Sequence, residues 1–549
     1  MASKKDKQTI QKTLNVIKEG ASKGYIPDDD VRNLFSLINS NTDQPREIRL
    51  TFSGKDNYFK ASKIEFIDAW EKRTIDLPGQ PKGTEFWLAF PENAYYRSSY
   101  LPNKINAELK ITAETTSEVW LNFSENTSLN VSFTVNAGSH HVYRLTQEQI
   151  KATYCELTST GPAGGFGFQI LKKGLQVVSD QSVSLCAMIQ TVLSTDVTDV
   201  LPTDKWGDTY YSINYQPYPS RIKTGIQYDP KSGYMIIARE NDTIIYENGI
   251  FKANINKGQV FCGYSFLGDM TGKYITTNKP AAFFTTTSMA QIPTGTKFND
   301  VLFQQLPPVN QWGRHFVVPL IPGLSENRIR VLAAKNQTNI TVTGITELPV
   351  TGTGGNASLS GLNAGEFVEL KLTNACGCYI VADKPVGTCA FLTGSDVNSD
   401  IGDPAQTWIP PLEQMDRNVL MSPFVPKDEV TRLKRHGILI IVPTAAKEQT
   451  DINSRLLPNA PPFNWIDVPG CDYSFLSLLE PGKNQSHSID NPGGVIVLGY
   501  GIGDGTGNEE SYYYVGKYGA NDLSSDFSVN EENYLNYGKK LYDNSSVFI

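Results

Sequence analysis

The hydrophobic pattern of the chain changes near residue 83. From there onward, apolar and polar residues alternate in short segments such as TYYSINY, YMIIARE, DTIIYENG and RIRVLAA. These segments are rich in β-branched and aromatic residues, and Gly, Asn, Asp and Pro separate them. A period of two residues with such boundaries is typical of β-strands. We therefore predict a mainly β structure, with no convincing amphipathic helix, for this part of the chain.

The first 45 residues follow a helical pattern instead. Ile10, Leu14 and Ile17 are spaced as one face of a helix that stops at Gly20. The acidic residues 28–30 can cap a second helix, whose apolar face would be Val31, Leu34, Phe35 and Ile38. Two short helices cannot bury both faces alone. We predict a small α-helical N-terminal anchor over residues 1–45, which packs against another chain or lies as a hairpin on the main body.

Two further segments flank the β region. In residues 46–82, Ile48, Leu50 and Phe52 alternate like a strand, and SGKDN has turn chemistry. This segment is predicted to be a small linker module. Residues 521–549 are polar and rich in Asn, Ser and Tyr, and they are predicted to form a C-terminal tail.

The β region contains a repeated element with an Asp or Asn followed by a strand. It occurs as SDQSVSLCAMI, TNKPAAFFTTT, ADKPVGTCAF and IDNPGGVIVLGYG, which align Asp180, Asn278, Asp383 and Asp490. Three copies carry a proline two residues later, at Pro280, Pro385 and Pro492. Because proline presets φ, the element predicts a tight turn that enters a buried strand.

A second repeated element follows each of the first three copies. It occurs as LPTDKWGDTYYSI, LPPVNQWGRHFVVP and IPPLEQMDRNVLMSPFVP, which align Trp206, Trp312 and Met415. A third, Ala-x-x-Asn-x-Thr, begins at Ala238 and Ala333 and continues to NKGQ and NAGE. A packing site tolerates exchange of Trp for Met better than a sugar-stacking site does. We therefore interpret the second element as the entry of a repeated module, with the tryptophan at a module junction.

The three elements recur with one period of about 100 residues, the size of one antiparallel sandwich. We predict four β-sandwich-like repeats, at residues 83–200, 201–305, 306–408 and 409–520. A propeller-like ring is the alternative, because sequence does not distinguish modules packed in line from modules packed in a circle.

Charge and cysteine usage narrow the class of protein. The net charge of −8 argues against a nucleic-acid partner, and no apolar run is long enough for a transmembrane helix. The N-terminus lacks the apolar core of a signal peptide. The seven cysteines are an odd number, and Cys186 and Cys389 lie in apolar strand-like runs, so we expect structural thiols.

Several stretches in fixed order resemble the IgGFc-binding-type domain family of mucus-associated and bacterial surface proteins. They are GTEFWLAFP, LPTDKWGDTYYSI, ARENDTIIY, DMTGKYITTNKPAAFF, QQLPPVNQWGRHFVV and GDPAQTWIPPLEQM, which span residues 83–426. The resemblance implies an extracellular, non-enzymatic binding or adhesion module. We do not transfer the antibody ligand of the family name, since no defined residue motif for it exists to match here.

Such domains usually follow a secretion signal, whereas this chain begins with a charged helical segment. We therefore expect a virion protein, made in the host cytoplasm: a fibre or decoration protein of a crAss-like bacteriophage that binds mucin or cell-surface glycans. Residues 1–80 would contact a capsid or other virion protein, and the N-terminal helices would form a homo-oligomer. The alternatives are a bacterial cell-surface adhesin whose signal was trimmed, and a glycan hydrolase.

Residues with enzymatic potential are few. None of the five histidines forms a metal-binding pair on one element, and no nucleophile elbow is present. We predict no enzymatic activity, no cofactor and no metal site. Glycan sites expose aromatic rings beside polar groups, and the candidates for ligand binding are Tyr95, Tyr96, Arg97, Tyr215, Tyr218 and Arg221.

Overall fold

The computed structural model describes two separate compact units, Met1–Lys82 with Asn521–Ile549 and Gly83–Ala520. Its described residues are 47–55, 58–67, 72–76 and 83–523, except for 98–104, 158–164, 192, 220–221, 224–225, 228–229, 346, 351–352, 399–400, 427–431, 454–463, 480–484 and 507–509. The predicted N-terminal helices and all but the first three residues of the predicted tail lie outside them.

The first unit contains a three-stranded antiparallel sheet. Its strands are β1 (Glu47–Lys55), β2 (Tyr58–Ile67) and β3 (Lys72–Asp76), in the order β1-β2-β3. The strand predicted from the alternation of Ile48, Leu50 and Phe52 is therefore present as β1.

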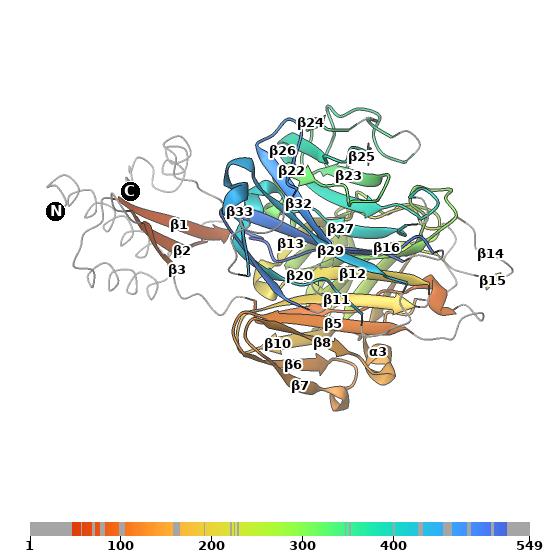
Figure 1. Ribbon diagram of the computed structural model, residues 1–549. Coiled ribbons are helices and arrows are strands. Elements are labelled where there is room, and N and C mark those ends of the chain that lie inside the picture. The colour runs from red at the N-terminus through yellow and green to blue at the C-terminus, as the bar shows by residue number, and fades with distance from the viewer. Residues whose placement is uncertain are drawn as a thin grey trace. The chain divides into compact units, whose positions relative to one another are not determined.

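The second unit is built from antiparallel sheets, which confirms the mainly β prediction (Figure 1). We call its four groups of strands modules 1 to 4. Module 1 holds two four-stranded sheets, β4-β10-β6-β7 and β12-β11-β5-β8. Their strands are β4 (Glu85–Leu88), β5 (Asn106–Ala113), β6 (Ser117–Phe123), β7 (Val131–Val135), β8 (Ser139–Arg144), β10 (Leu175–Ser179), β11 (Val183–Thr191) and β12 (Ser194–Val200). The short helices are η1 (Ala94–Arg97), η2 (Thr127–Leu129) and α3 (Gln147–Thr153).

Helix α3 was not predicted from the sequence. Thr146 and Gln149 form a capping box at its N-terminus, in which each side chain bonds the backbone of the other residue. The helix has only seven residues, too few for an amphipathic pattern to stand out from the strands around it.

Modules 2 and 3 each centre on one long strand. Module 2 contains η3 (Thr203–Lys205), β13 (Gly207–Tyr211), β14 (Ile222–Lys223), β15 (Ile226–Gln227), β16 (Ser232–Ala238), β17 (Thr243–Glu247), β18 (Ile250–Ile255), β19 (Val260–Ser265), β20 (Tyr274–Ala290) and β21 (Asp300–Gln305). Module 3 contains η4 (Val309–Gln311), β22 (Gly313–Val318), β23 (Asn327–Ala333), β24 (Ile340–Thr343), β25 (Phe367–Leu372), β26 (Cys378–Leu392) and β27 (Ala405–Trp408). Strand β9 (Phe166–Leu171) lies between α3 and β10 of module 1 in sequence but pairs with β19 of module 2.

Module 4 repeats the plan around β33. It contains η5 (Leu412–Gln414), β28 (Asp416–Met421), β29 (Arg435–Pro443), η6 (Thr444–Gln449), β30 (Asp451–Ile452), β31 (Ile466–Asp467), β32 (Tyr473–Leu479), β33 (His487–Ile502) and β34 (Tyr512–Val515). In modules 2 to 4, the first half of the long strand pairs with β13, β22 or β28, and the second half pairs with β16, β23 or β29.

The predicted Asp/Asn-x-Pro turn is wrong for these three modules, because the element lies inside the long strand. In module 2, β20 pairs with β13 at Thr276 and again at Ala281, so the residues between them bulge out of the register. Because of the bulge, one long strand pairs with one partner strand along its first half and with another along its second half. Only in module 1 does the element separate two strands, β10 and β11.

The recurrence of Asp or Asn in this element has a structural cause. The side-chain oxygens of Asp180, Asn278 and Asp383 accept hydrogen bonds from backbone N–H groups at the start of the neighbouring strand, at 2.7–2.8 Å. The donors are Glu118, Ile244 and Asn339. The element therefore satisfies a backbone donor next to the bulge.

The second repeated element, which we call the tryptophan box, forms an equivalent 3-10 turn in each of its three copies. A proline stands at the N-cap of each turn. The indole N–H of Trp206 donates to the carbonyl of Leu201, and that of Trp312 donates to Pro307. The boxes also stack on each other: a side chain at Gly207 would collide with Pro308, and one at Gly313 would collide with Pro411. The box is therefore a junction between consecutive modules.

The four modules close into a ring. The last strand of each module, β12, β21, β27 or β34, packs chiefly against its two neighbours in this cyclic order, and β12 also contacts β27. Module 4 meets module 1, where the buried amine of Lys110 donates to the carbonyl oxygens of Ser422, at 2.7 Å, and Pro423. Met188 and Val197 of module 1 also share a hydrophobic cluster with Met421 and Phe424.

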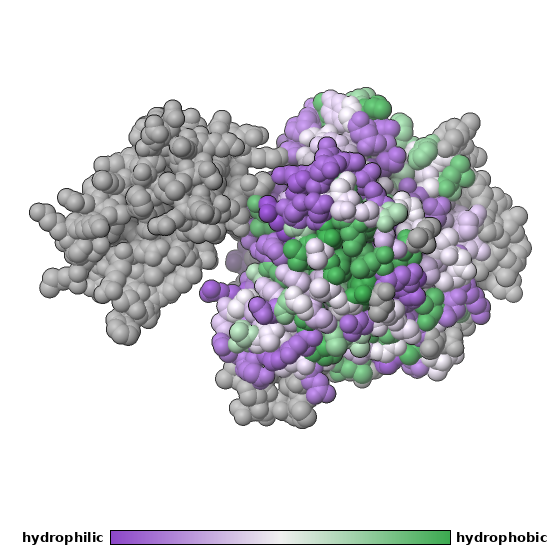
Figure 2. All heavy atoms as spheres, turned by 90° about the horizontal axis from the view of Figure 1, so that it is seen from above, coloured by the Kyte–Doolittle hydropathy of each residue, from purple (hydrophilic) through white to green (hydrophobic). Residues whose placement is uncertain are grey.

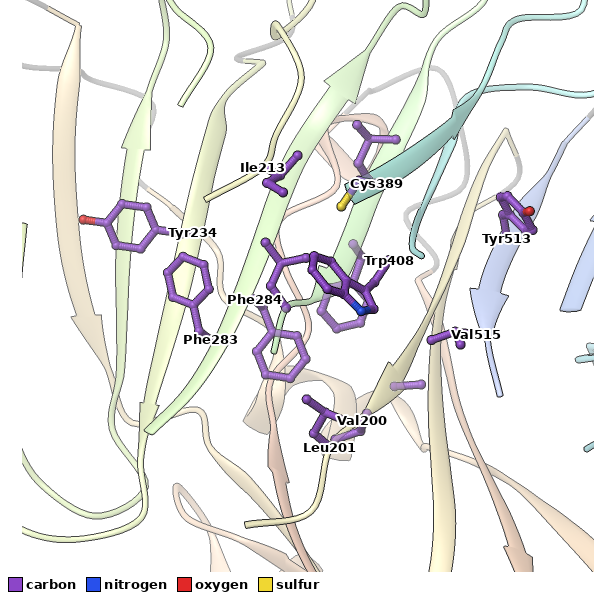
Figure 3. Packing of buried hydrophobic residues seen from close by; sticks show 14 of the residues in the cluster. Val200, Leu201, Ile213, Tyr234, Phe283, Phe284, Cys389, Trp408, Tyr513 and Val515 are labelled. Atoms are coloured by element: carbon purple, nitrogen blue, oxygen red, sulfur yellow. The ribbon is translucent and has the colours of Figure 1, made fainter. Parts of the chain in front are cut away.

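One apolar core connects the modules at the centre of this ring. Figure 3 shows residues of this core in one packed group: Val200 at the end of β12, Leu201 directly after it, Phe284 from β20, Trp408 from β27 and Val515 from β34. At one end of the same four strands, equivalent positions hold Ser194, Asp300, Asp403 and Glu510, all buried. Burial and the neighbouring carboxylates raise the pKa of Asp300.

Candidate functional site: a charged groove between modules 1 and 2

An open groove of about 550 Å³ lies where modules 1 and 2 meet. Module 1 contributes one residue from β4, and module 2 contributes residues from the β16–β17 loop, the β18–β19 turn and β20. The lining residues are Glu85, Arg239, Glu240, Asn241, Asp242, Lys257 and Lys279. Its lining therefore combines three carboxylates, three cations and an amide.

The repeated Ala-x-x-Asn-x-Thr element shapes the rim of this groove. Asp242 has a positive φ of 55°, and the hydroxyl of Thr243 donates to the carbonyl of Glu240 at 2.9 Å. The side chain of Asn241 accepts the backbone N–H of Lys257 at 3.1 Å. These bonds join the loop to the β18–β19 turn, so that both present their side chains to one groove.

Gly258 brings the β18–β19 turn against module 1. Its φ of +78° favours glycine, and a Cβ there would stand 2.2 Å from the hydroxyl oxygen of Ser124. The close approach places the amine of Lys257 5.7 Å from the centre of the Trp87 ring, within cation–π range.

The charges of the groove are held by specific partners. Glu85 accepts the indole N–H of Trp87 at 3.0 Å and pairs with Arg239 at 3.2 Å. Lys279 donates to the carbonyl of Asn241 at 2.6 Å and lies 3.8 Å from Glu240. The side chain of Arg239 is 43% exposed, so its remaining N–H groups can reach a ligand.

The chemistry of the lining suits the recognition of polar groups. Carboxylates, amides and cations can bond hydroxyl or amide groups from several directions. Throughout the described residues, no group of three or more His, Cys, Asp or Glu is placed to hold a metal ion.

The equivalent loop of module 3 has the same backbone bonds. Thr338 donates to the carbonyl of Lys335, Ala364 donates its N–H to Asn336, and Lys384 donates to the carbonyl of Asn336. The side chains differ: Arg239 and Glu240 of module 2 correspond to Ala334 and Lys335. The groove thus combines a repeated skeleton with charges particular to module 2.

The structure brings together two of the tyrosines predicted from the sequence. Tyr95 is buried beside Met289, and half-buried Tyr218 packs against this small cluster. The hydroxyl of Tyr95 donates to the backbone and side chain of Asn299. The side chains of Tyr96, Arg97 and Arg221, the other predicted residues of these stretches, lie outside the described part.

Tyr215 lies apart from them, in the core between modules 2 and 3. Its ring stacks under the guanidinium of Arg330 at 4.1 Å, and its hydroxyl donates to Glu369 at 3.1 Å. With 1% of its surface exposed, the ring contributes to packing between modules in this structure.

The groove residues were not among the sequence candidates. Arg239, Lys257 and Lys279 stand within or directly beside repeated elements, which were interpreted as architecture. The sequence did carry one signal, because Arg239 in module 2 stands where the equivalent loop of module 3 has Ala334. The sequence does not show which module lies opposite this loop, so the charge could not be assigned to a groove.

The thiols and the surface complete the chemical description. All seven cysteines are free, and burial raises the pKa of Cys389 to about 12. No helix among the described residues is long and apolar enough to cross a membrane. Figure 2 shows a face on which hydrophobic side chains gather in one area bordered by hydrophilic ones. Apolar surface is therefore available outside the core.

The structure is thus a repeat-built β protein with an open, charged groove. The chain is a member of the IgGFc-binding family: the family model described as IgGFc binding protein matches residues 196–501, more than half of the chain. This match confirms the resemblance seen in the repeated boxes. The stretch GTEFWLAFP precedes the matched range.

A curated relative supports the same assignment. Over 240 residues, 44% of this chain, the sequence is 25% identical to the IgGFc-binding protein of Homo sapiens. The alignment covers only 4% of that protein's length. No solved structure matches the chain.

Proposed function

We propose that the chain is a non-enzymatic adhesion protein that binds hydroxyl- and amide-rich surface ligands, with mucin or cell-surface glycans as the class. The groove between modules 1 and 2 is the proposed site. The observation that carries the proposal is its lining, in which cations, carboxylates and an amide converge on an open space. The name of the human relative, an IgGFc-binding protein, also supports a binding role.

The closed ring supports this role physically. Modules 1 and 2 are joined by β9–β19 pairing and by the approach of Gly258 to Ser124. A groove between parts that are fixed in this way loses little conformational entropy when a ligand binds.

We further propose that the ring is displayed on a virion, as a fibre or decoration protein. The first unit, which is separate from the ring, would attach it to a capsid or other virion protein and form a homo-oligomer. Immunogold labelling of intact particles tests this location. Label on the particle surface supports it, and label confined to a bacterial cell envelope supports an adhesin instead.

Binding is tested with immobilised mucin and purified chain. We expect saturable binding, with recovered mucin glycans chemically unchanged. Lys279→Ala should weaken binding about fivefold, because one cation is worth roughly 1 kcal/mol at a partly exposed site.

Lys384→Ala is the matched control, since Lys384 makes the equivalent bond to the loop of module 3. It should bind mucin like the wild type. Equal effects of the two changes, or no mucin binding, would contradict the groove assignment. Release of glycans that stops after one Asp or Glu substitution would show an enzyme.

A further inference from the structure

A second candidate surface lies along β9. The strand FGFQIL alternates exposed and half-buried residues. Phe166, Phe168 and Ile170 point to solvent and are 54%, 53% and 40% exposed. Leu267, which lies next to the start of the strand at Gly165, is 67% exposed. Scattered exposed apolar residues need no explanation, but a contiguous stripe on one strand does.

Strand pairing and ring stacking hold the stripe in place. β9 pairs with β19 over its whole length, and Phe168 stacks on Phe261 of that strand with 5.3 Å between ring centres. The strand stands at one end of its sheet order in the described part of the chain. Large aromatic side chains held in place in this way bind a partner at small entropic cost.

Cations border the stripe at both ends. The amine of Lys273 lies 5.1 Å from the centre of the Phe166 ring. Exposed Lys172 directly follows the last residue of β9, two residues after Ile170. A ligand that fits this surface has apolar groups in the middle and negative charge at each end.

We propose that β9 docks an extended acidic and apolar segment of a partner protein, which lies alongside the strand. The stripe is one side chain wide and about 20 Å long, which matches an extended chain. Such a segment places alternate side chains against Phe166, Phe168 and Ile170, and its terminal carboxylates meet Lys273 and Lys172. This surface is separate from the groove proposed for glycans and serves a different class of partner.

The test uses two labelled synthetic peptides of about eight residues, enough to span β9. Both alternate Val and Thr; one has Glu at each end and the other Lys. Fluorescence anisotropy with the full chain should show saturable binding of the Glu peptide and at least fivefold weaker binding of the Lys peptide. Raising the salt concentration should weaken only the Glu peptide.

Variants locate the binding. Phe168→Ser should weaken the Glu peptide about tenfold through loss of its aromatic anchor, and Lys273→Glu should weaken it about threefold. The matched control is Phe251→Ser, because Phe251 is 58% exposed on β18 of the same sheet. It should leave binding unchanged, and all three variants should keep the wild-type melting temperature.

Three results would overturn the proposal. The first is equal binding of both peptides, or no loss with Phe168→Ser. The second is sedimentation of the chain as a dimer that Phe168→Ser dissociates, which would make β9 a contact between copies. The third is Phe168-dependent binding to phosphatidylserine vesicles with no peptide binding, which would make it a membrane contact. Mucin binding by Lys279→Ala is measured separately, so failure of one proposal leaves the other standing.

Discussion

Modules 2 and 3 have nearly the same skeleton and different surfaces. In both, a long strand bulges next to an Asn or Asp that accepts a backbone N–H, at Asn278 in β20 and Asp383 in β26. In both, a lysine beside the bulge donates to a carbonyl of the loop that follows β16 or β23. Only module 2 carries Arg239 and Glu240 in that loop, where β4 of module 1 supplies Glu85.

The comparison separates architecture from recognition. Residues that recur at equivalent positions make hydrogen bonds within a module or pack at junctions. The groove is lined by residues that differ between the equivalent loops, such as Arg239 and Glu240, together with Asn241 and Lys279, which recur in module 3. In a ring of repeats, we therefore expect ligand selectivity to depend on the positions where the repeats diverge, and three predictions probe this division.

The largest effect should come from the tryptophan boxes. Trp312→Ala should lower the free energy of unfolding by about 4 kcal/mol, because the ring is 1% exposed and lies near Tyr211 and Trp408. Trp206→Ala should cost less, since Trp206 is 8% exposed. Chemical denaturation measures both; a smaller loss for Trp312→Ala would contradict its place at the junction.

The paired lysines should have smaller effects on stability. Lys279→Ala removes one hydrogen bond to a loop carbonyl and an ion pair with Glu240, and Lys384→Ala removes two hydrogen bonds to loop carbonyls. Each interaction is worth less than about 1 kcal/mol at a partly exposed site, so the denaturant midpoints should shift by similar small amounts. A shift for only one of the two variants would contradict the equivalence of the two loops.

The smallest effect concerns pH. The N–H of Asn339, followed by its side-chain amide, donates to Asp383 and holds the pKa of that carboxyl below its usual value. The contribution of Asp383 is therefore complete above the pKa of the unfolded state and is lost as the pH falls through the folded value. Asn278 does not titrate.

Hydrogen exchange measures this difference between modules. The amide of Asn339 should lose protection at acidic pH relative to neutral pH, after correction for intrinsic exchange, and the amide of Ile244 should not. Asp383→Asn should remove the acid dependence at Asn339. Equal acid dependence at both amides would contradict the assigned role of the carboxylate.

The sequence predicted the class of the fold because its local signals agree with the structure. Alternation in YMIIARE became β16, and the aligned tryptophans became equivalent 3-10 turns. It failed at Asn278-Lys279-Pro280, where turn residues occupy a bulge. Local chemistry there is the same for a turn and a bulge, and only the partner strands decide between them.

The candidate site was harder to predict. Glu85 and Lys279 are far apart in sequence and meet only because modules 1 and 2 pack on each other. Tyr215 has the composition of a ligand-binding residue, yet its ring is covered by Arg330. Burial of an aromatic residue depends on tertiary packing, which a single sequence does not encode by spacing alone.

The central claim, that four modules close into a ring, is tested most directly by a zero-length carbodiimide cross-link. The amine of Lys517 in module 4 lies 3.3 Å from Glu114 of module 1 and 3.8 Å from Asp416 of its own module. Mass spectrometry of the monomer should find both links, and Lys517→Arg should remove both. A monomer that gives the Lys517–Asp416 link without the Lys517–Glu114 link would contradict the closed ring.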